Sequence, residues 1–319
     1  MTGSDSGKAG GELTGEQHER LAALRSAETL ADLAQLTGAD SEHDAYLRAK
    51  TEWEYLRERA LDEPANTDGL PGDCVVIDGQ EFHVHGITHA DTDAERSFLR
   101  RHVQRILDSG GSVYCEQGIR PMYFDDMDEV CEIDDYRWAM HHCRTLDIDS
   151  HIEGEIERAF DDGRADLQSV TGRFREVTFS LIDAGGEVYG DRFASALGDV
   201  ASDFLMTHEE LATGEDFASF RRSRDAAENP DELARLQQYY RRAFLPQPLE
   251  REWLRRHDPE LELFTHARNE RIAAYVLAHG TNSQPVHVVT GAAHQPGVVY
   301  YLAAYRDGEW EFGTLETVP

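Results

Sequence analysis

The spacing of apolar residues divides the chain into a helical first part and a later part in which strands and helices alternate. Residues 1–13 are rich in Gly, Ser and Asp, and we expect a disordered tail there. Helically spaced apolar residues follow, with capping-box patterns that begin at Thr14 and at Ser41. A loop that contains Pro and Gly closes this region. The pattern therefore predicts a helical N-terminal extension over residues 14–72.

Short apolar runs bounded by turn residues predict the strands. Residues 74–77 and 81–85 flank Asp78-Gly79, which is a two-residue hairpin signal. Two further runs, at 112–115 and 285–290, are typical of strands in a sheet interior. The strands therefore begin after the helical extension and recur near the end of the chain.

Helical patterns occupy most of the positions between the strands. One helix is expected over residues 92–110 and another over 295–308, with a proline at the permissive start of the second. Residues 120–280 look like a mostly helical insertion, and residues 310–318 like a closing strand or hairpin. The sequence therefore predicts a helix-rich α/β domain over residues 73–319. We expect a central mixed sheet with helices on both faces.

The same construction occurs twice: an apolar strand, a Gly-x-x-His segment and then a helix. The two copies end at His89 and His294. Glycine allows the backbone to turn sharply after each strand, which puts each histidine at the carboxyl end of a strand. Ligands of open α/β sheets collect at that edge. If the two strands are neighbours, both imidazoles face one crevice, and Glu116, which ends the 112–115 strand, can join them.

Two histidines and a carboxylate are a common ligand set for a catalytic divalent metal with open positions. A water bound to such a metal has a lowered pKa and can attack a carbonyl carbon. The simpler interpretation, in which each histidine only caps or packs locally, suits a single Gly-x-x-His better than a pair of them.

The motifs resemble those of the TraB/Tiki group, which belongs to a wider superfamily with ChaN-like haem-binding proteins and erythromycin esterases. The similar segments are Val84-His85-Gly86-Ile87-Thr88-His89, Val113-Tyr114-Cys115-Glu116, Tyr189-Gly190-Asp191-Arg192, Arg268-Asn269-Glu270-Arg271-Ile272-Ala273 and Val288-Val289-Thr290-Gly291-Ala292-Ala293-His294-Gln295-Pro296-Gly297. This chain departs from the group in two places. Arg120 follows Glu116 one residue sooner than expected, and Ala267 stands where the group usually has Glu.

The resemblance implies an α/β fold with two related halves whose Gly-x-x-His loops meet at one site. It implies metal-dependent peptide cleavage with manganese or cobalt in the Tiki branch, and ester hydrolysis in the esterase branch. In the TraB branch it implies shutdown of a peptide pheromone. We therefore expect a metal-dependent hydrolase of a small peptide or ester, with manganese, cobalt or zinc as the metal.

Roles can be assigned to the matching residues on this hypothesis. His89, His294, Glu116 and Asn269 are the candidate metal ligands, and Glu116 is alternatively the general base. Arg268 would stabilise an oxyanion or bind a substrate carboxylate. Arg120 is a further catalytic candidate. A buried ion pair that ties helices together is the alternative role for Arg268 and for Asp191–Arg192.

A second hypothesis is a non-catalytic regulator that binds haem or a peptide in the same pocket. His89 or Tyr114 would then be the axial ligand of the haem iron. An anion site at the two loops is a third possibility, but neither loop has the glycine density of a phosphate cradle.

Charge excludes several classes of partner. The 62 acidic residues outnumber the 31 basic residues, and the formal net charge of −31 argues against nucleic acid and against an anionic membrane surface. Lys8 and Lys50 are the only lysines. A surface dense in carboxylates and poor in lysine is typical of proteins adapted to a high-salt cytoplasm, where salt screens the repulsion. The rival explanation is a surface that binds a cationic partner.

Localisation and cysteine usage complete the expectations. No apolar run approaches the ~18 residues of a membrane span, and the N-terminus lacks the apolar core of a signal peptide. We expect a soluble cytoplasmic protein, with a homodimer as a possibility. Cys131 and Cys143 flank His141-His142 in a weak zinc-like pattern. A helix with small buried thiols is the simpler interpretation of that pattern.

Overall fold

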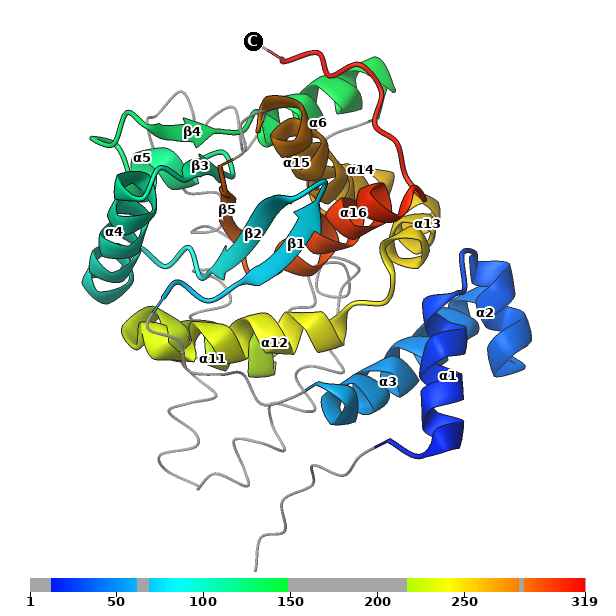
Figure 1. Ribbon diagram of the computed structural model, residues 1–319. Coiled ribbons are helices and arrows are strands. Elements are labelled where there is room, and N and C mark those ends of the chain that lie inside the picture. The colour runs from blue at the N-terminus through cyan, green and yellow to red at the C-terminus, as the bar shows by residue number, and fades with distance from the viewer. Residues whose placement is uncertain (1–12, 62–68, 149–216, 281–283, 319) are drawn as a thin grey trace, which may run out of the picture.

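A five-stranded mixed sheet lies at the centre of the structure (Figure 1). The computed structural model describes residues 13–61, 69–148, 217–280 and 284–318. The strands, in the spatial order β1-β2-β5-β3-β4, are β1 (Asp73–Ile77), β2 (Gln80–Ile87), β3 (Ser112–Cys115), β4 (Val130–Glu132) and β5 (Val286–Gly291). β1 runs antiparallel to β2, whereas the other neighbouring pairs are parallel. The predicted α/β class and mixed sheet are therefore confirmed.

Helices account for most of the remaining described residues. They are α1 (Gly15–Arg25), α2 (Leu30–Thr37), α3 (Glu42–Ala60), α4 (Asp93–Asp108), α5 (Ile119–Tyr123), α6 (Asp135–Thr145), α11 (Phe217–Glu228), η1 (Pro230–Glu232), α12 (Leu233–Ala243), α13 (Gln247–His257), α14 (Pro259–Phe264), α15 (His266–His279) and α16 (Gln295–Asp307). The expected tail and the Tyr189–Arg192 motif lie outside the described residues, apart from Leu13.

Alternating side chains give the sheet two apolar faces. Val84 of β2 belongs to a core cluster with Ile272 of α15 and Leu302 of α16. On the opposite face, Val113 of β3 shares a second cluster with Leu99 of α4. Figure 1 shows α4 and the α15–α16 pair on opposite sides of the strands. Apolar clusters thus cover parts of both faces of the sheet.

The three N-terminal helices pack against α13 around an apolar core of their own. The Tyr46 ring of α3 stacks on Trp253 of α13, with ring centroids 4.6 Å apart. The carboxylate of Glu250 on α13 is buried at the same contact. It accepts hydrogen bonds from the Tyr46 hydroxyl at 2.5 Å and from Lys50 Nζ at 3.3 Å. This polar contact fixes the position of α3 on α13.

Side chains at the helix starts satisfy the first free N–H groups. Thr14 and Gln17 make both bonds of a capping box at α1. Ser41 caps α3 by accepting a bond from the backbone N–H of Asp44. These local signals are readable from the sequence because each involves residues only three positions apart.

The segment predicted to be mostly helical also contains a strand. β4 pairs in parallel with β3, so that Val113 lies beside Val130 and Cys115 beside Glu132. The prediction of a mostly helical segment did not include this strand. Three residues are too few to show a period-two pattern, and the pairing depends on a partner distant in sequence.

The closing strand predicted over residues 310–318 does not form. Instead, side chains bind the backbone of this stretch. The N–H of Val318 donates to Asp134 at 2.8 Å, and Arg271 donates to the carbonyl oxygen of Glu316 at 2.9 Å. Trp310 packs beside Tyr301 of α16. The alternating pattern here reflects contact with helices and not pairing in the sheet.

None of the helices in the described ranges is both long enough and apolar enough to cross a lipid bilayer.

The contact between α3 and α13 can be tested with Tyr46→Phe, which removes the hydroxyl group and keeps the ring. We expect the free energy of unfolding to fall by about 1–3 kcal/mol, because buried Glu250 loses a hydrogen-bond donor. Denaturant unfolding in high salt measures the change. Tyr55→Phe is the control, since the Tyr55 side chain is 49% exposed. Equal stability of Tyr46→Phe and the wild type would contradict this packing.

Candidate functional site

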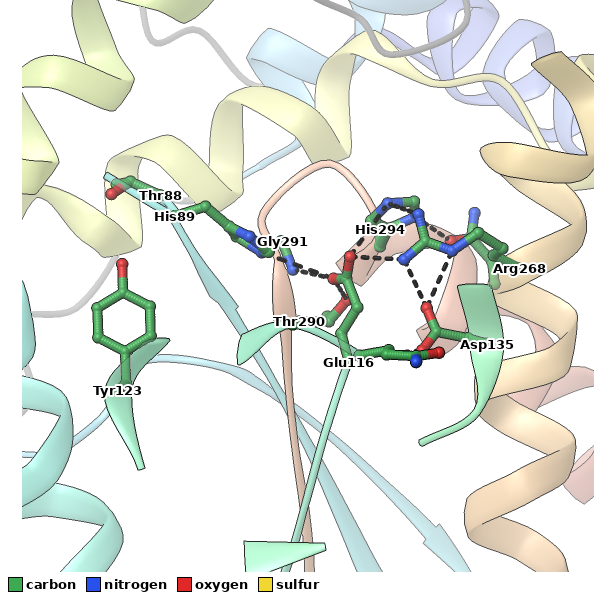
Figure 2. Close-up of polar contacts among 12 residues, drawn as sticks. Thr88, His89, Glu116, Tyr123, Asp135, Arg268, Thr290, Gly291 and His294 are labelled. Carbon is green, nitrogen blue, oxygen red and sulfur yellow. Dashed lines mark hydrogen bonds and ion pairs between the residues drawn. The ribbon is translucent and has the colours of Figure 1, made fainter. Parts of the chain in front are cut away.

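The two Gly-x-x-His loops lie side by side at the carboxyl edge of the sheet. β2 and β5 are parallel neighbours, and their register pairs Ile87 with Gly291. β3 flanks β5 on its other side and ends just before Glu116. Nε2 of His89 lies 3.6 Å from Glu116 Oε2, and Nε2 of His294 lies 3.9 Å from Glu116 Oε1. Figure 2 shows the two imidazoles on either side of this carboxylate.

The two glycines allow the loops to approach each other closely. A Cβ on Gly86 would lie 2.8 Å from the Cα of Ala292 in the other loop. A Cβ on Gly291 would lie 3.2 Å from His89 Nε2 and 3.6 Å from Glu116 Oε2. Neither glycine has a positive φ. The sharp turn expected at these two glycines therefore does not form. Their lack of a Cβ instead allows the two loops to pack closely together.

The carboxylate of Glu116 is buried and fully bonded. Oε1 accepts from Arg268 Nη2 at 2.6 Å, whereas Oε2 accepts from the Thr290 hydroxyl at 2.8 Å and from the Gly291 N–H at 2.7 Å. Burial raises the pKa of Glu116, but its interactions with His294, Arg268 and His89 together hold it well below its ordinary value. Glu116 is therefore ionised.

Arg268 of α15 is fixed between two carboxylates. Besides Glu116, it binds Asp135 of α6 through Nε at 2.9 Å. Its guanidinium also lies 3.5 Å from the centre of the Tyr136 ring. Burial opposes the charge, but Tyr136, Asp135 and Glu116 raise the pKa of Arg268. Its fork is therefore filled, and binding of a substrate carboxylate is not open to it. Asp135 gave no signal in the sequence, because its role depends on how α6 packs on α15.

His294 is held as a neutral base. Its Nδ1 lies 2.8 Å from Oδ1 of Asn269, whose Nδ2 donates to Gln247 at 3.0 Å. Because the amide oxygen only accepts, Nδ1 carries the proton and Nε2 carries the lone pair. Burial lowers the pKa of His294 to about 4, and nearby Arg268 contributes to this shift. Nε2 is therefore unprotonated at neutral pH and faces Glu116.

His89 has the opposite tendency. Burial opposes its charge, but Glu116 and Glu95 outweigh that effect and raise the pKa of His89. Its Nε2 is buried, and no described residue bonds to it. The backbone of His89 has a φ of 60°, in the left-handed region that costs energy for a residue with a side chain. Surrounding contacts must therefore hold the loop.

A buried carboxylate on α4 supplies those contacts. Glu95 accepts from the N–H and the hydroxyl of Thr88, at 2.8 and 2.7 Å, and from the N–H of Ala90 at 3.2 Å. The hydroxyl of Tyr123 donates to it at 2.5 Å. Glu95 therefore fixes the backbone on both sides of His89. The sequence pattern Thr92-x-x-Glu95 is typical of a capping box, but here the glutamate reaches beyond the cap to the loop.

A small cavity of about 90 Å³ opens beside the two histidines. His89, His294 and Asn269 line it, together with Tyr240 of α12 and Phe244. This volume holds a few waters or one small substrate group. The cavity thus gives solvent and a small ligand access to His294, whose Nε2 also lies 3.4 Å from Arg268 Nη1.

The described side chains around Glu116 do not fit the ligand set of a divalent metal. Both oxygens of Glu116 already accept hydrogen bonds. Nη1 of Arg268 lies 3.4 Å from His294 Nε2, the atom that would face a metal, and its fixed charge opposes a cation there. Asn269 orients His294 and has no free oxygen to offer. The residues predicted as ligands are thus brought together, but as a hydrogen-bonded cluster.

Two other predicted residues lie away from the cluster. Arg120 of α5 points to the surface, where Nη2 lies 3.5 Å from Asp128. Gly118 has a φ of 93° and turns the chain after Glu116. The next residue, Ile119 of α5, is buried. Tyr114 belongs to the α15–α16 face of the sheet, and its hydroxyl donates to the carbonyl oxygen of His279 at 3.1 Å.

The zinc-like pattern around His141 does not form a cluster in the described residues. Cys143 is buried on α6, whereas Cys131 is exposed on β4. The simpler interpretation therefore holds for Cys143 and is wrong for Cys131, which is neither helical nor buried. The short strand that carries Cys131 had no pattern of its own in the sequence.

The opposed pKa values of the two histidines can be measured by NMR titration of their ring protons. We expect His294 to stay neutral through the range in which ordinary histidines titrate, and His89 to lose its proton above the ordinary value of 6.5. Glu116→Gln removes the charge that supports His89, so its pKa should fall below that of the wild type. Titration of both rings near the ordinary value in the wild type would contradict the site as described.

Comparisons of the chain with protein-family models, with curated proteins and with solved structures each found no match. The resemblance to the TraB/Tiki group therefore stays a prediction from the motifs. The function has to be proposed from the geometry of the site.

Proposed function

We propose that this protein hydrolyses an ester or peptide bond in a small substrate, with His294 as general base and His89 as general acid. The observation that supports the proposal is the pair of histidines with opposed pKa shifts on one buried carboxylate. Paired groups whose surroundings push their pKa values apart are typical of acid–base catalysis. The adjacent cavity supplies the space in which a water and a carbonyl group can meet.

The first step uses the lone pair of His294. Nε2 takes a proton from a water in the cavity, and the water oxygen forms a bond to the carbonyl carbon. Positive charge then develops on His294, 3.9 Å from the carboxylate of Glu116, which favours it. Asn269 keeps the ring in the required tautomer through its bond to Nδ1.

The second step uses the proton of His89. In its charged form, His89 stabilises the negative oxygen of the tetrahedral intermediate. It then gives its Nε2 proton to the departing oxygen or nitrogen as the bond to the carbonyl carbon breaks. Solvent returns a proton to His89 and removes one from His294, so water is the only reagent consumed.

Charge balance supports these protonation states. Glu116 and Asp135 each carry a negative charge, and Arg268 carries one positive charge within the same buried cluster. Glu95 adds a further negative charge beside His89, so a proton on His89 reduces the excess negative charge of the group and with it the cost of burial. Arg268 thus acts as a positioning residue for Glu116, in place of the predicted oxyanion role.

The cavity favours a small substrate over haem. Tyr240 and Phe244 give it an apolar wall that suits a short acyl or side-chain group. Tyr114, the alternative haem ligand, is not among the described residues that line the cavity, and its hydroxyl donates to the carbonyl oxygen of His279. Tight binding of a peptide without cleavage is the outcome that would favour the regulatory hypothesis.

The assigned roles can be tested with His294→Gln and His89→Gln. Each variant should lower kcat/KM by about 10²- to 10⁴-fold, because each removes one proton transfer. A panel of small esters and peptides, assayed in high salt, identifies a substrate and measures the loss. His141→Gln is the matched control, since His141 is exposed on α6 and should leave the rate unchanged. Wild-type rates in both cavity variants would refute the assignment.

Dependence on metal separates this mechanism from the one predicted from the motifs. Because the described cluster offers no open donor set, we expect exhaustive chelation to leave the hydrolysis rate unchanged. The rate is measured before and after chelator treatment, and again after manganese, cobalt or zinc is added. A rate lost on chelation and restored by one of these ions would support the metal-dependent hydrolase instead.

A further inference from the structure

The β1–β2 hairpin carries a second group of polar side chains, far along the strand from the loop of His89. The antiparallel register places Cys74 opposite His83 and Val76 opposite Glu81. Directly opposed residues point to the same face of a sheet, and so do residues two positions apart on one strand. Cys74, Glu81 and His83 therefore share one face of the hairpin.

The donor atoms of these three residues converge. His83 Nε2 lies 2.9 Å from Glu81 Oε2 and 4.0 Å from Cys74 Sγ. One sulfur, one nitrogen and one carboxylate oxygen all lie within 4.8 Å of one another. In tetrahedral zinc sites the metal–ligand bonds are about 2.0–2.3 Å, so ligand atoms lie somewhat under 4 Å apart. Small side-chain rotations bring the three atoms to those distances.

Stacked imidazole rings orient the ring of His83. Its ring lies parallel to that of His287 on β5, with centroids 4.6 Å apart and an interplanar angle of 10°. His287 is held in turn by a 3.0 Å hydrogen bond between its Nδ1 and Nε2 of His85. Nδ1 of His85 donates to the carbonyl oxygen of Pro71 at 2.9 Å. The stacked rings therefore restrict the orientation of His83.

The group is also accessible to ions. Cys74 and Glu81 are exposed, and His83 is partly buried. The neighbouring Asp73 is paired with Arg241 at 2.7 Å, so it does not compete for the same ion. Among the described residues, this is the group whose donor atoms gather closely enough to hold a metal.

We propose that Cys74, Glu81 and His83 bind one zinc ion, with water as the fourth ligand. A thiolate, an imidazole and a carboxylate form a borderline-soft set that suits zinc better than magnesium, calcium or manganese. On binding, the Cys74 thiol loses its proton to solvent and its sulfur bonds to the metal. The ion would join β1 to β2 at the edge of the sheet. This site is independent of the proposed hydrolase and shares no residue with it.

Cobalt(II), used in place of zinc, distinguishes a metal site that has a cysteine ligand from one that has none. Titration of the full-length protein should produce a thiolate-to-cobalt charge-transfer band in the near ultraviolet, with one cobalt per chain, and zinc should abolish the band. The band should vanish in Cys74→Ser and weaken in His83→Gln. It should persist in Cys131→Ser, the exposed-cysteine control, and in His89→Gln, which alters the other histidine site.

Zinc affinity and thermal stability give a second readout. Cys74→Ser should weaken zinc binding by more than about 100-fold, since losing even a supporting contact of a ligand costs about 10- to 100-fold. Zinc should raise the Tm of the wild type and leave that of Cys74→Ser unchanged. The proposal is overturned if no charge-transfer band forms, if the band depends on Cys131, or if bound metal is lost in His89→Gln and retained in Cys74→Ser.

Discussion

The buried ion pair between Glu116 and Arg268 holds the end of β3 to α15, and the rest of the site is arranged around it. The carboxylate also accepts hydrogen bonds from Thr290 and Gly291 at the end of β5. The ends of β3 and β5 and one helix thus meet at a single charged group. Removal of one partner from such a buried pair typically costs about 3–5 kcal/mol, because the other charge is left uncompensated. The same interaction therefore holds the fold together and sets the charge of the site.

The electrostatic character of the site follows from the unequal surroundings of its two histidines. Burial lowers the pKa of His294, and the nearby charge of Arg268 adds to that shift. Burial also opposes the charge of His89, but Glu116 and Glu95 outweigh it and raise the pKa. Glu95 also holds the left-handed backbone at His89 in place. The hydrogen bonds of one buried carboxylate thus offset the unfavourable energy of that backbone conformation. Such strain is common at functional residues.

Much of the fold and part of the site could be predicted from local patterns. The hairpin at Asp78-Gly79 and the caps at Thr14 and Ser41 depend on residues close in sequence, and the structure has them. The meeting of the two Gly-x-x-His loops could be predicted only on condition that their strands are neighbours. Arg120, predicted as a catalytic residue from its place in the motif, lies away from the cluster, because closeness in sequence to Glu116 does not imply closeness in space.

The sequence by itself determined the α/β class, the two repeated motifs and the acidic surface, because periodicity and composition are local properties. The tertiary structure decided which charges share a buried environment. Asp135 comes to Arg268, and Glu95 to the loop of His89, only when helices pack. The pKa of a histidine depends on every charge within a few ångströms and on its burial, and neither can be read along the chain.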